Sequence, residues 1–486
     1  MKKFRRIMVI LVSVILSLTM ITSCVNNGDN ASSGLGDHLT ASSVTESEST
    51  STTDGSSSNE SSNTSTSGSS TSGSSSTGSS STGGSTSSGL SVSSSAPINQ
   101  NPSSNSPNVP VIPASKYGLQ VTSEGVVTLN GKTFYGMGVN QHGAFRYGEL
   151  AKALGHKGQG IGINIDGYFK PLLDNGIPFV RCQLGVFYAN EVKYYVDQHD
   201  LYMQAMDKFF AKAEEYNIGI IASLMWNLGT FCEYYGEPVS EIANPNSKGV
   251  KLAVKYVTEI AERYKDCPAL WAYEIGNEGN LGVDLRWIGP QHMDLTTAQL
   301  NSYYKIISAA IKAKDPNRLL VAGDSEPRGS SKALRTRQSW APADTYADTK
   351  ETMSYYSPNP LNAISVHMYN ESSDPASVRD FNTPIAKYMK IAKELKKALF
   401  VGEFGPASDI GDFNACANAI VSNGVQLSAA WCYRRDEQPS DGTSITPGAR
   451  NNDAWLKIIS VNKNYKSRGL TETSEYWAGV TNKFYK

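Results

Sequence analysis

The sequence predicts an α/β fold, a (β/α)8 barrel preceded by a disordered linker. Two observations indicate the barrel: 372 residues remain beyond position 114, and in them eight short apolar runs alternate with helical patterns. An open doubly wound sheet is the alternative. No GxGxxG motif follows any expected strand, so a nucleotide-binding sheet of that kind has no support.

Residues 1–23 resemble a bacterial lipoprotein signal peptide. A basic start, Lys2 to Arg6, precedes the apolar run 7–20, which has the length of a secretory signal and is short for a membrane-spanning helix. Residues 21–24 resemble a lipobox, which implies cleavage before Cys24 and acylation of its thiol. The alternative is an ordinary signal peptide with a chance cysteine. We expect a protein that is anchored by lipid at Cys24 to the outside of the cell membrane.

Residues 31–107 consist mostly of Ser, Thr, Gly and Asn and hold hardly a large apolar side chain. Such a segment buries too little apolar surface to fold, so we expect a disordered tether with an r.m.s. span of roughly 50 Å. The expected domains are therefore the signal peptide 1–23, the tether 24–114 and a barrel domain 115–486.

Charge and cysteine content exclude several classes of protein. The chain has 44 Lys and Arg against 45 Asp and Glu, without the basic excess that nucleic-acid binders usually carry. Five cysteines remain beyond Cys24, an odd number that leaves at least one thiol unpaired within the chain. No CxxC or HExxH motif occurs. We expect a monomer with no metal, no cofactor and no nucleic-acid partner.

The barrel domain is expected to open with a hairpin, because Asn130 and Gly131 separate two short apolar-polar runs. Apolar runs then predict eight barrel strands: residues 135–140, 179–184, 218–226, 270–277, 319–323, 363–369, 399–404 and 425–431. Apolar residues at helical spacing predict helices between them: residues 251–264, 303–313, 385–395 and 415–421. The polar stretch 325–360 is the expected insertion between the fifth and sixth strands.

Two glutamates stand at strand ends, where barrel enzymes carry their catalytic groups. Glu278 ends the fourth expected strand and Glu403 the seventh. Because strand side chains alternate, Glu403 shares a face with Val401 and Leu399, and we expect that face to point into the barrel. Glu278 shares its face with Glu274, which lies deeper and is expected to be paired and structural.

Glu278 and Glu403 would then converge above the barrel axis. Two convergent carboxyl groups suit the cleavage of a glycosidic bond, because one donates a proton and the other attacks or stabilises the anomeric carbon. The alternative is a pair of structural carboxylates in salt bridges. Asp324 and Glu326 follow the fifth strand and are further loop carboxylates that could line the same cleft.

Seven residues that lie on the expected strands or directly after them carry a resemblance to a known family. In chain order, they are Arg181, Asn277, Glu278, His367, Tyr369, Glu403 and Trp431. Their order and placement resemble glycoside hydrolase family 5, the cellulase and mannanase family. The resemblance spans residues 117–431 and implies a (β/α)8 barrel and a retaining β-glycosidase.

The resemblance also implies roles for these residues. Glu278 would be the acid/base, which needs surroundings that keep it protonated near neutral pH. Glu403 would be the nucleophile, held ionised by Arg181 and hydrogen-bonded by Tyr369. A retaining mechanism needs the two carboxyl groups about 5–5.5 Å apart.

The other matching residues would bind substrate. Asn277 would hydrogen-bond the sugar at the cleavage subsite, and His367 would line the same subsite. Trp431 would be the sugar platform, and Trp226 is a weaker aromatic candidate of the same kind.

The sequence departs from the family pattern in two places. Gly279 follows Glu278 where the family usually has Pro, and the third strand ends in Trp226-Asn227 where many members place a His. The expected substrate is a β-linked polysaccharide of the β-glucan or β-mannan class. The alternative function is a non-catalytic carbohydrate-binding lipoprotein on a degenerate barrel, which the presence of both glutamates disfavours.

Overall fold

The structure is a computed structural model that describes residues 116–155, 164–285, 295–370, 379–434 and 443–480. The expected signal peptide, the lipidation site Cys24 and the tether lie outside these residues, so the domain boundaries stay predictions. None of the described helices combines the length and the apolar character that crossing a membrane requires.

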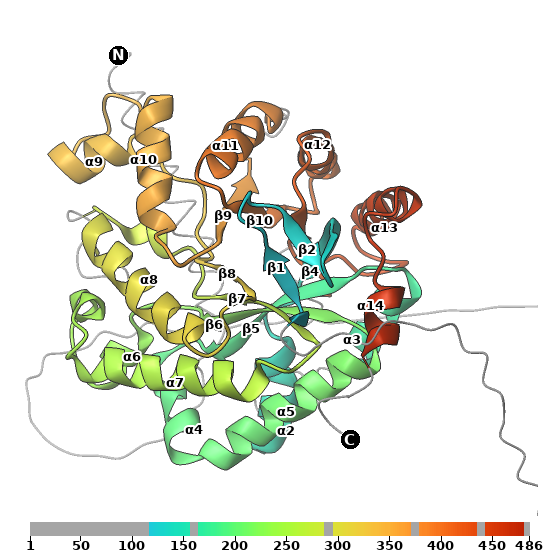
Figure 1. The fold of residues 1–486 in the computed structure, drawn as a ribbon, viewed down its shortest axis with the longest axis horizontal. Coiled ribbons are helices and arrows are strands. Elements are labelled where there is room, and N and C mark those ends of the chain that lie inside the picture. The colour runs from blue at the N-terminus through green and yellow to red at the C-terminus, as the bar shows by residue number, and fades with distance from the viewer. Residues whose placement is uncertain (1–115, 156–163, 286–294, 371–378, 435–442, 481–486) are drawn as a thin grey trace, which may run out of the picture. The chain divides into compact units, whose positions relative to one another are not determined.

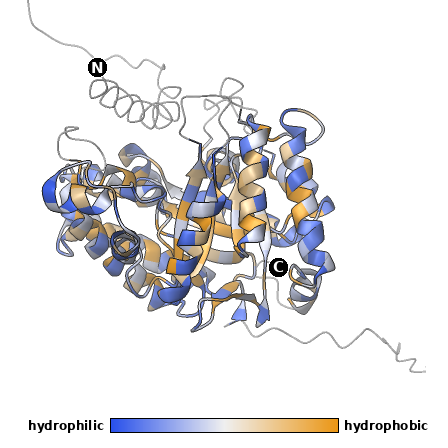
Figure 2. Cartoon of the chain, turned by 90° about the horizontal axis from the view of Figure 1, so that it is seen from above, coloured by the Kyte–Doolittle hydropathy of each residue, from blue (hydrophilic) through white to orange (hydrophobic). Residues whose placement is uncertain are grey.

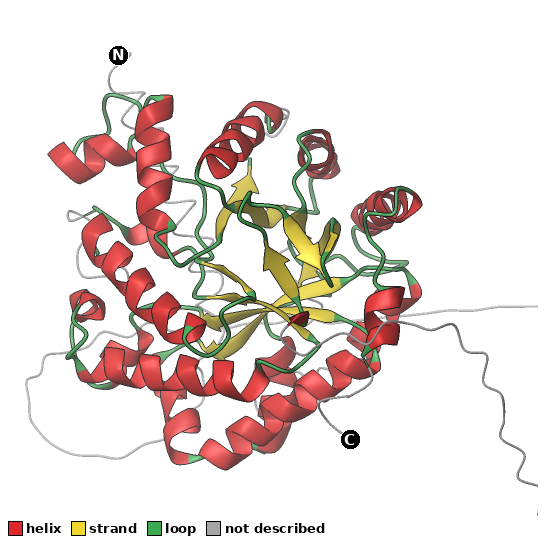
Figure 3. Cartoon of the chain, in the orientation of Figure 1, coloured by secondary structure: helices red, strands yellow, loops and turns green. Residues whose placement is uncertain are grey.

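Eight parallel strands form the centre of the molecule (Figure 3). They are β4 (Gly136–Asn140), β5 (Phe179–Val186), β6 (Gly219–Met225), β7 (Leu270–Glu274), β8 (Leu319–Val321), β9 (Ala363–Tyr369), β10 (Ala398–Gly405) and β11 (Leu427–Ala430). The ladder runs β8-β7-β6-β5-β4-β11-β10-β9. Asn362 joins its two ends, because its amide N–H donates to Leu320 O at 3.2 Å and its Oδ1 accepts from Leu320 N at 2.8 Å. The sheet is therefore a closed barrel, and each of the eight predicted strands overlaps one of these.

Helices surround the strands on the outside (Figure 1). They are α2 (Ala151–Ala153), α3 (Ile165–Asp174), α4 (Val192–Asp197), α5 (His199–Glu215), α6 (Thr230–Tyr234), α7 (Lys248–Tyr264), α8 (Thr297–Lys312), α9 (Ser331–Arg337), α10 (Tyr346–Tyr356), α11 (Asn382–Glu394), α12 (Ile410–Ser422), α13 (Asn452–Ser467) and α14 (Ser474–Gly479). The predicted helices correspond to α7, α8, α11 and α12, and the expected insertion holds α9 and α10. Figure 2 shows mostly hydrophobic strands inside helices that carry hydrophilic bands.

The start of α7 illustrates why these segments are helical. Ser247 precedes the helix and its hydroxyl accepts from Val250 N at 3.1 Å, which satisfies one of the free N–H groups of the first turn. Val250, Val257 and Ile260 then recur at helical spacing and are buried. The helix thus covers the barrel with one apolar face and leaves its charged face to solvent.

The predicted hairpin is present, with one strand that the sequence did not predict. β2 (Val127–Leu129) and β3 (Lys132–Thr133) flank a turn in which Asn130 and Gly131 have φ of 50° and 72°. The additional strand β1 (Leu119–Val121) pairs antiparallel with β2. β1, β2 and Tyr476 of α14 share an apolar cluster with residues of the barrel strands such as Phe179 and Phe400.

The prediction that the face of Leu399 and Val401 points into the barrel is wrong. Both side chains belong to the outer core with the helices, whereas Phe400 belongs to the inner cluster. The pairing of β10 with β9 shifts register between Val401 and Glu403, so one residue of β10 is extra. This bulge turns Glu403 inward, where Arg181 contacts its carboxylate.

The fourth predicted strand, 270–277, is too long. β7 ends at Glu274, and Glu278 has a left-handed backbone with φ of 51°. Side-chain alternation along a strand therefore does not set the direction of Glu278; the turn that follows β7 does.

The five cysteines among the described residues are all buried, and no disulfide joins any two of them. The odd number predicted at least one cysteine outside any disulfide within the chain, and among the described residues this holds for all five. The barrel is therefore held by packing and hydrogen bonds rather than by disulfides among the described residues.

Candidate active site

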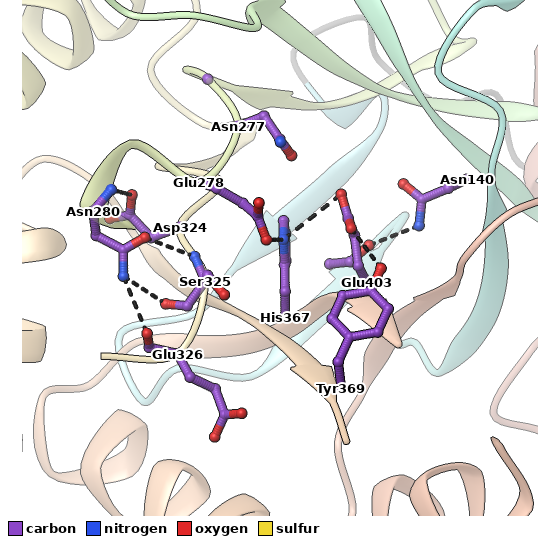
Figure 4. Close-up of polar contacts among 12 residues, drawn as sticks. Asn140, Asn277, Glu278, Asn280, Asp324, Ser325, Glu326, His367, Tyr369 and Glu403 are labelled. Carbon is purple, nitrogen blue, oxygen red and sulfur yellow. Dashed lines mark hydrogen bonds and ion pairs between the residues drawn. The ribbon is translucent and has the colours of Figure 1, made fainter. Parts of the chain in front are cut away.

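The residues singled out in the sequence as matching the family meet in the structure; Arg181 lies within β5, and the others lie in or after the carboxyl-terminal parts of β7, β9, β10 and β11. Figure 4 shows Glu278 and Glu403 on either side of His367, with Tyr369 below Glu403. Glu278 and His367 are 89 positions apart in the chain, and Arg181 and Glu403 are 222 apart. A closed parallel barrel brings them together because all of its strands end on one face.

Arg181 on β5 is the centre of the cluster and is fully buried. Its Nε lies 3.0 and 2.9 Å from the two carboxylate oxygens of Glu274, and its Nη1 donates to Glu403 Oε1 at 2.8 Å. Nη1 also donates to Asn140 Oδ1 at 2.9 Å, and Nη2 to Asn277 Oδ1 at 2.7 Å. Burial lowers the pKa of Arg181, but the Glu274 and Glu403 carboxylates raise it further, so the guanidinium stays charged.

Glu403 is buried and accepts hydrogen bonds on both carboxylate oxygens. Arg181 donates to Oε1, and the Tyr369 hydroxyl donates to Oε2 at 2.7 Å. Burial and the Glu403 charge raise the pKa of Tyr369 well above its ordinary value, so its hydroxyl keeps its proton and remains a donor. Both carboxyl oxygens of Glu403 therefore have a donor, and one of the two donors is cationic.

Glu278 lies in different surroundings. Desolvation raises its pKa to about 7, against the positive charge of Arg181 and a hydrogen bond from Ser325, which lower it. His367 Nδ1 lies 2.9 Å from Glu278 Oε1. Burial lowers the pKa of His367 to about 4, so the ring is neutral near pH 7 and its contact with Glu278 is a hydrogen bond. At neutral pH a large fraction of Glu278 therefore carries a proton.

Glu278, His367 and Glu403 each offer one oxygen or nitrogen atom, and these three atoms lie within 4.8 Å of one another. That spacing would also suit a metal ion. The hydrogen bonds just described already account for the arrangement, and the expectation of a metal-free protein stays a prediction.

Two tryptophans predicted to contact substrate lie next to the cluster. Trp226 is only 7% exposed; its ring stacks on Phe187 at 5.7 Å and lies 5.5 Å from the Arg181 guanidinium. Trp431 is half-buried and stacks on His142 at 5.6 Å. Trp226 has little surface left for a sugar ring, so Trp431 is the better placed of the two.

Asn140 is a site residue that the sequence reasoning did not select. It ends β4, its Oδ1 accepts from Arg181, and its Nδ2 donates to Gly402 O at 2.9 Å and to Ala429 O at 3.1 Å. Asn140 thus ties the arginine to the bulge of β10. Its position at the end of the first strand was the available signal, the same one that identified the glutamates.

Comparison with known sequences identifies the family. A sequence profile described as Cellulase (glycosyl hydrolase family 5) matches residues 155–436, more than half of the chain. The chain belongs to glycoside hydrolase family 5. The matched region contains β5 to β11 and both glutamates. The family resemblance inferred from the strand-end residues is therefore confirmed.

Two curated relatives illustrate the similarity. The probable mannan endo-1,4-beta-mannosidase F of Aspergillus flavus is 24% identical over 283 residues, covering 54% of this chain and 56% of the relative. The mannan endo-1,4-beta-mannosidase F of Aspergillus fumigatus is 22% identical over 263 residues, covering 52% and 53%. The chain thus spans about half the length of the curated relatives it matches.

A solved structure shares the fold. The crystal structure of the endo-1,4-beta-mannanase from Rhizomucor miehei superposes with a TM-score of 0.56 at 18% identity, covering 72% of this chain and 99% of that chain. At this identity the likeness shows the fold alone. It confirms the (β/α)8 barrel predicted from the sequence.

Proposed function

We propose that this chain is a retaining glycoside hydrolase that cleaves β-1,4-linked mannans. The observation that carries the proposal is the pair of carboxyl groups, since one oxygen of Glu278 and one of Glu403 lie within 4.8 Å of each other. Retaining enzymes hold their carboxyl groups about 5–5.5 Å apart, whereas inverting enzymes need about 6.5–9.5 Å to admit a water. The short separation favours direct attack by one carboxylate.

The surroundings of the two groups support different roles. Glu403 is held as a carboxylate by Arg181 and Tyr369, which suits a nucleophile. Glu278, with a pKa of about 7 raised by desolvation, is partly protonated at neutral pH, which suits an acid that later acts as a base.

The reaction then takes two steps. First, an oxygen of Glu403 forms a bond to the anomeric carbon while the proton of Glu278 passes to the leaving glycosidic oxygen. Second, Glu278 takes a proton from a water, and the water oxygen displaces Glu403 from the anomeric carbon. Both carboxyl groups return to their starting states. In this proposal Asn277, His367 and Trp431 contact the sugar at the cleavage point.

The relatives support mannan as the substrate. Two curated relatives are named mannan endo-1,4-beta-mannosidases, and the structure from Rhizomucor miehei is that of an endo-1,4-beta-mannanase. The test is reducing-sugar release by the purified chain from galactomannan, glucomannan, carboxymethyl cellulose, β-1,3-glucan and xylan. We expect release from the two mannans above all. Release from cellulose or β-1,3-glucan instead would support the hydrolase activity and contradict mannan as the substrate. Binding to a polymer without any release would favour the carbohydrate-binding alternative.

The proposed acid predicts the alkaline limit of the pH profile. Only protonated Glu278 can donate to the glycosidic oxygen, and desolvation raises its pKa to about 7. We expect kcat/KM on mannopentaose to fall as pH rises through about 7, because the protonated fraction falls tenfold for each further pH unit. A 2,4-dinitrophenyl glycoside needs no proton on its leaving group, so its kcat/KM should lack this limb. The same alkaline limb with both substrates would assign it to a group other than the acid.

We propose further that the barrel is anchored outside the cell membrane by lipid at Cys24. The support is the basic start, the apolar run and the lipobox-like residues before Cys24. In a bacterial host we expect wild-type protein in the membrane fraction, labelled by an alkyne fatty acid. Cys24→Ala should lose the label. Unlabelled wild-type protein in the culture fluid would contradict the anchor.

A further inference from the structure

The carboxyl of Glu278 is carried by a turn. β7 ends four residues earlier, Glu278 itself has φ of 51°, and the short 3₁₀ helix Gly279–Gly282 follows directly. A non-glycine residue in the left-handed region persists only where surrounding contacts hold it. The position of the proposed acid therefore depends on what restrains residues 278–281.

Residues 324–328, which follow β8, supply this restraint, and most of their contacts are with Asn280 of the turn (Figure 4). Asn280 Nδ2 donates to Ser325 O at 2.9 Å and to Glu326 O at 3.3 Å, and Asn280 Oδ1 accepts from Ser325 N at 2.9 Å. Arg328 donates to the backbone oxygens of Asn280 and Leu281. The side chain of one asparagine thus joins the acid-bearing turn to the neighbouring strand end.

Asp324 holds the backbone of the same turn. Asp324 is 2% exposed, and its Oδ1 accepts from Asn280 N at 3.2 Å and from the Tyr304 hydroxyl at 2.6 Å. Tyr304 is fixed in turn, because it is a buried residue of α8. Asp324 therefore connects the turn to a helix of the outer ring as well as to β8.

Gly279 makes room for this arrangement. A Cβ at position 279 would lie 2.8 Å from the Tyr304 hydroxyl and 2.5 Å from Leu228 Cδ1. A larger residue would therefore push Tyr304 away from Asp324. At this same position the chain departs from the family pattern of Pro, which would itself stiffen the turn. The chain thus has the more flexible residue, Gly279, directly after Glu278, and the buried carboxyl group of Asp324 restrains the backbone of Asn280.

We propose that Asp324 is a positioning residue for Glu278, which it aims at the glycosidic oxygen by anchoring the Asn280 backbone beside Gly279. The proposal rests on the proposed function of Glu278 as the acid. It assigns Asp324 no contact with substrate. Loss of Asp324 should therefore impair protonation of the leaving group and spare the attack of Glu403.

Two substrates that differ only in the leaving group separate these effects. Phenyl β-mannobioside needs a proton on its leaving oxygen, whereas 2,4-dinitrophenyl β-mannobioside does not. In Asp324→Ala we expect kcat/KM for the phenyl glycoside to fall about 10- to 100-fold, the effect of a misplaced catalytic group, and kcat/KM for the dinitrophenyl glycoside to change little. In Asp324→Asn the amide oxygen still accepts from Asn280, so it should restore most of the phenyl activity.

Asp207→Ala is the matched control. Asp207 also accepts a tyrosine hydroxyl, from Tyr264 at 2.7 Å, but lies on α5 in the outer ring. The Asp207→Ala variant should change kcat/KM for both glycosides by the same factor. Equal losses for both glycosides in a folded Asp324→Ala protein, or no loss for either, would overturn the proposal. If Glu278→Gln fails to discriminate between the glycosides, the acid assignment itself fails.

Hydrogen exchange tests the hydrogen bond between Asn280 N–H and Asp324 without any substrate. In Asp324→Ala the amide of Asn280 loses its acceptor, so it should exchange about tenfold faster or more, whereas Asp207→Ala should leave it unchanged. This measurement shows whether Asp324 holds the backbone of Asn280 even if the wild type cleaves neither glycoside. A wild type that cleaves neither glycoside would count against the proposed function alone. Unchanged exchange at Asn280 would overturn the role of Asp324.

Discussion

Replacing Glu403 with Gln should lower kcat/KM on mannan by a factor on the order of 10⁴ or more, because an amide cannot form the glycosyl bond. The fold should survive the change, since Gln has the size of Glu and its oxygen can still accept from Tyr369, which donates to Glu403 at 2.7 Å. Arg181 also keeps Glu274 as a charged partner. The measurement is the initial rate of reducing-sugar release, with a thermal melt of the same sample.

Glu259→Gln is the control for this change. Glu259 also accepts from a tyrosine, Tyr195 at 2.6 Å, but it belongs to α7 in the outer ring. We expect this variant to keep its activity. If Glu403→Gln retained more than about a hundredth of the wild-type rate, the loss would be too small for a nucleophile.

Azide separates the roles of the two glutamates with 2,4-dinitrophenyl β-mannobioside. In Glu403→Gly azide should enter where the nucleophile acted and yield the α-glycosyl azide. In Glu278→Gly it should attack the glycosyl-enzyme and yield the β-glycosyl azide. The opposite pairing of products would exchange the two roles.

Replacing Arg181 with Met should destabilise the fold by about 3–5 kcal/mol, because it leaves buried carboxylates without their cation. The Arg181 and Glu274 side chains are both 0% exposed, and that of Glu403 is 6% exposed. Because these carboxylates are buried, water cannot solvate them to replace the stabilisation that the ion pair with Arg181 provides. The measurement is the free energy of unfolding from denaturant titration at neutral pH. Activity should also fall, because Glu403 and Asn277 lose a donor that orients them.

The double variant Arg181→Met/Glu274→Gln shows whether unpaired charge is the cause. Removing the Glu274 charge should recover part of the lost stability, although the packing around position 181 is the same in both proteins. A loss below about 1 kcal/mol in Arg181→Met would be typical of a solvated surface pair and would contradict the buried network.

The barrel could be predicted from the sequence because the patterns that indicate its strands and helices are local. Apolar runs and helical spacing determine which segments are strands and helices, and closure follows from their number and order. The two glutamates were also found locally, as polar residues after apolar strands. Their convergence was predicted correctly but for the wrong reason, because alternation assumes a regular ladder. The extra residue between Val401 and Glu403 and the left-handed backbone of Glu278 both break that assumption.

The supporting contacts were harder to predict because they join distant segments. Asn280 and Asp324 are 44 positions apart, and Asp324 and Tyr304 are 20 apart. Nothing in the composition of either segment indicates which asparagine meets which aspartate. The one local signal was Gly279, whose departure from the family pattern marks the turn where the compensating contacts lie.

The stereochemistry of the first product tests the central claim most directly. Proton NMR recorded during hydrolysis of mannopentaose follows the anomeric proton of each new reducing end before mutarotation mixes the anomers. One oxygen of Glu278 and one of Glu403 lie within 4.8 Å of each other, which fits double displacement, so the β-anomer should form first. If the α-anomer forms first, a water attacks directly, and the assignment of Glu403 as nucleophile is wrong.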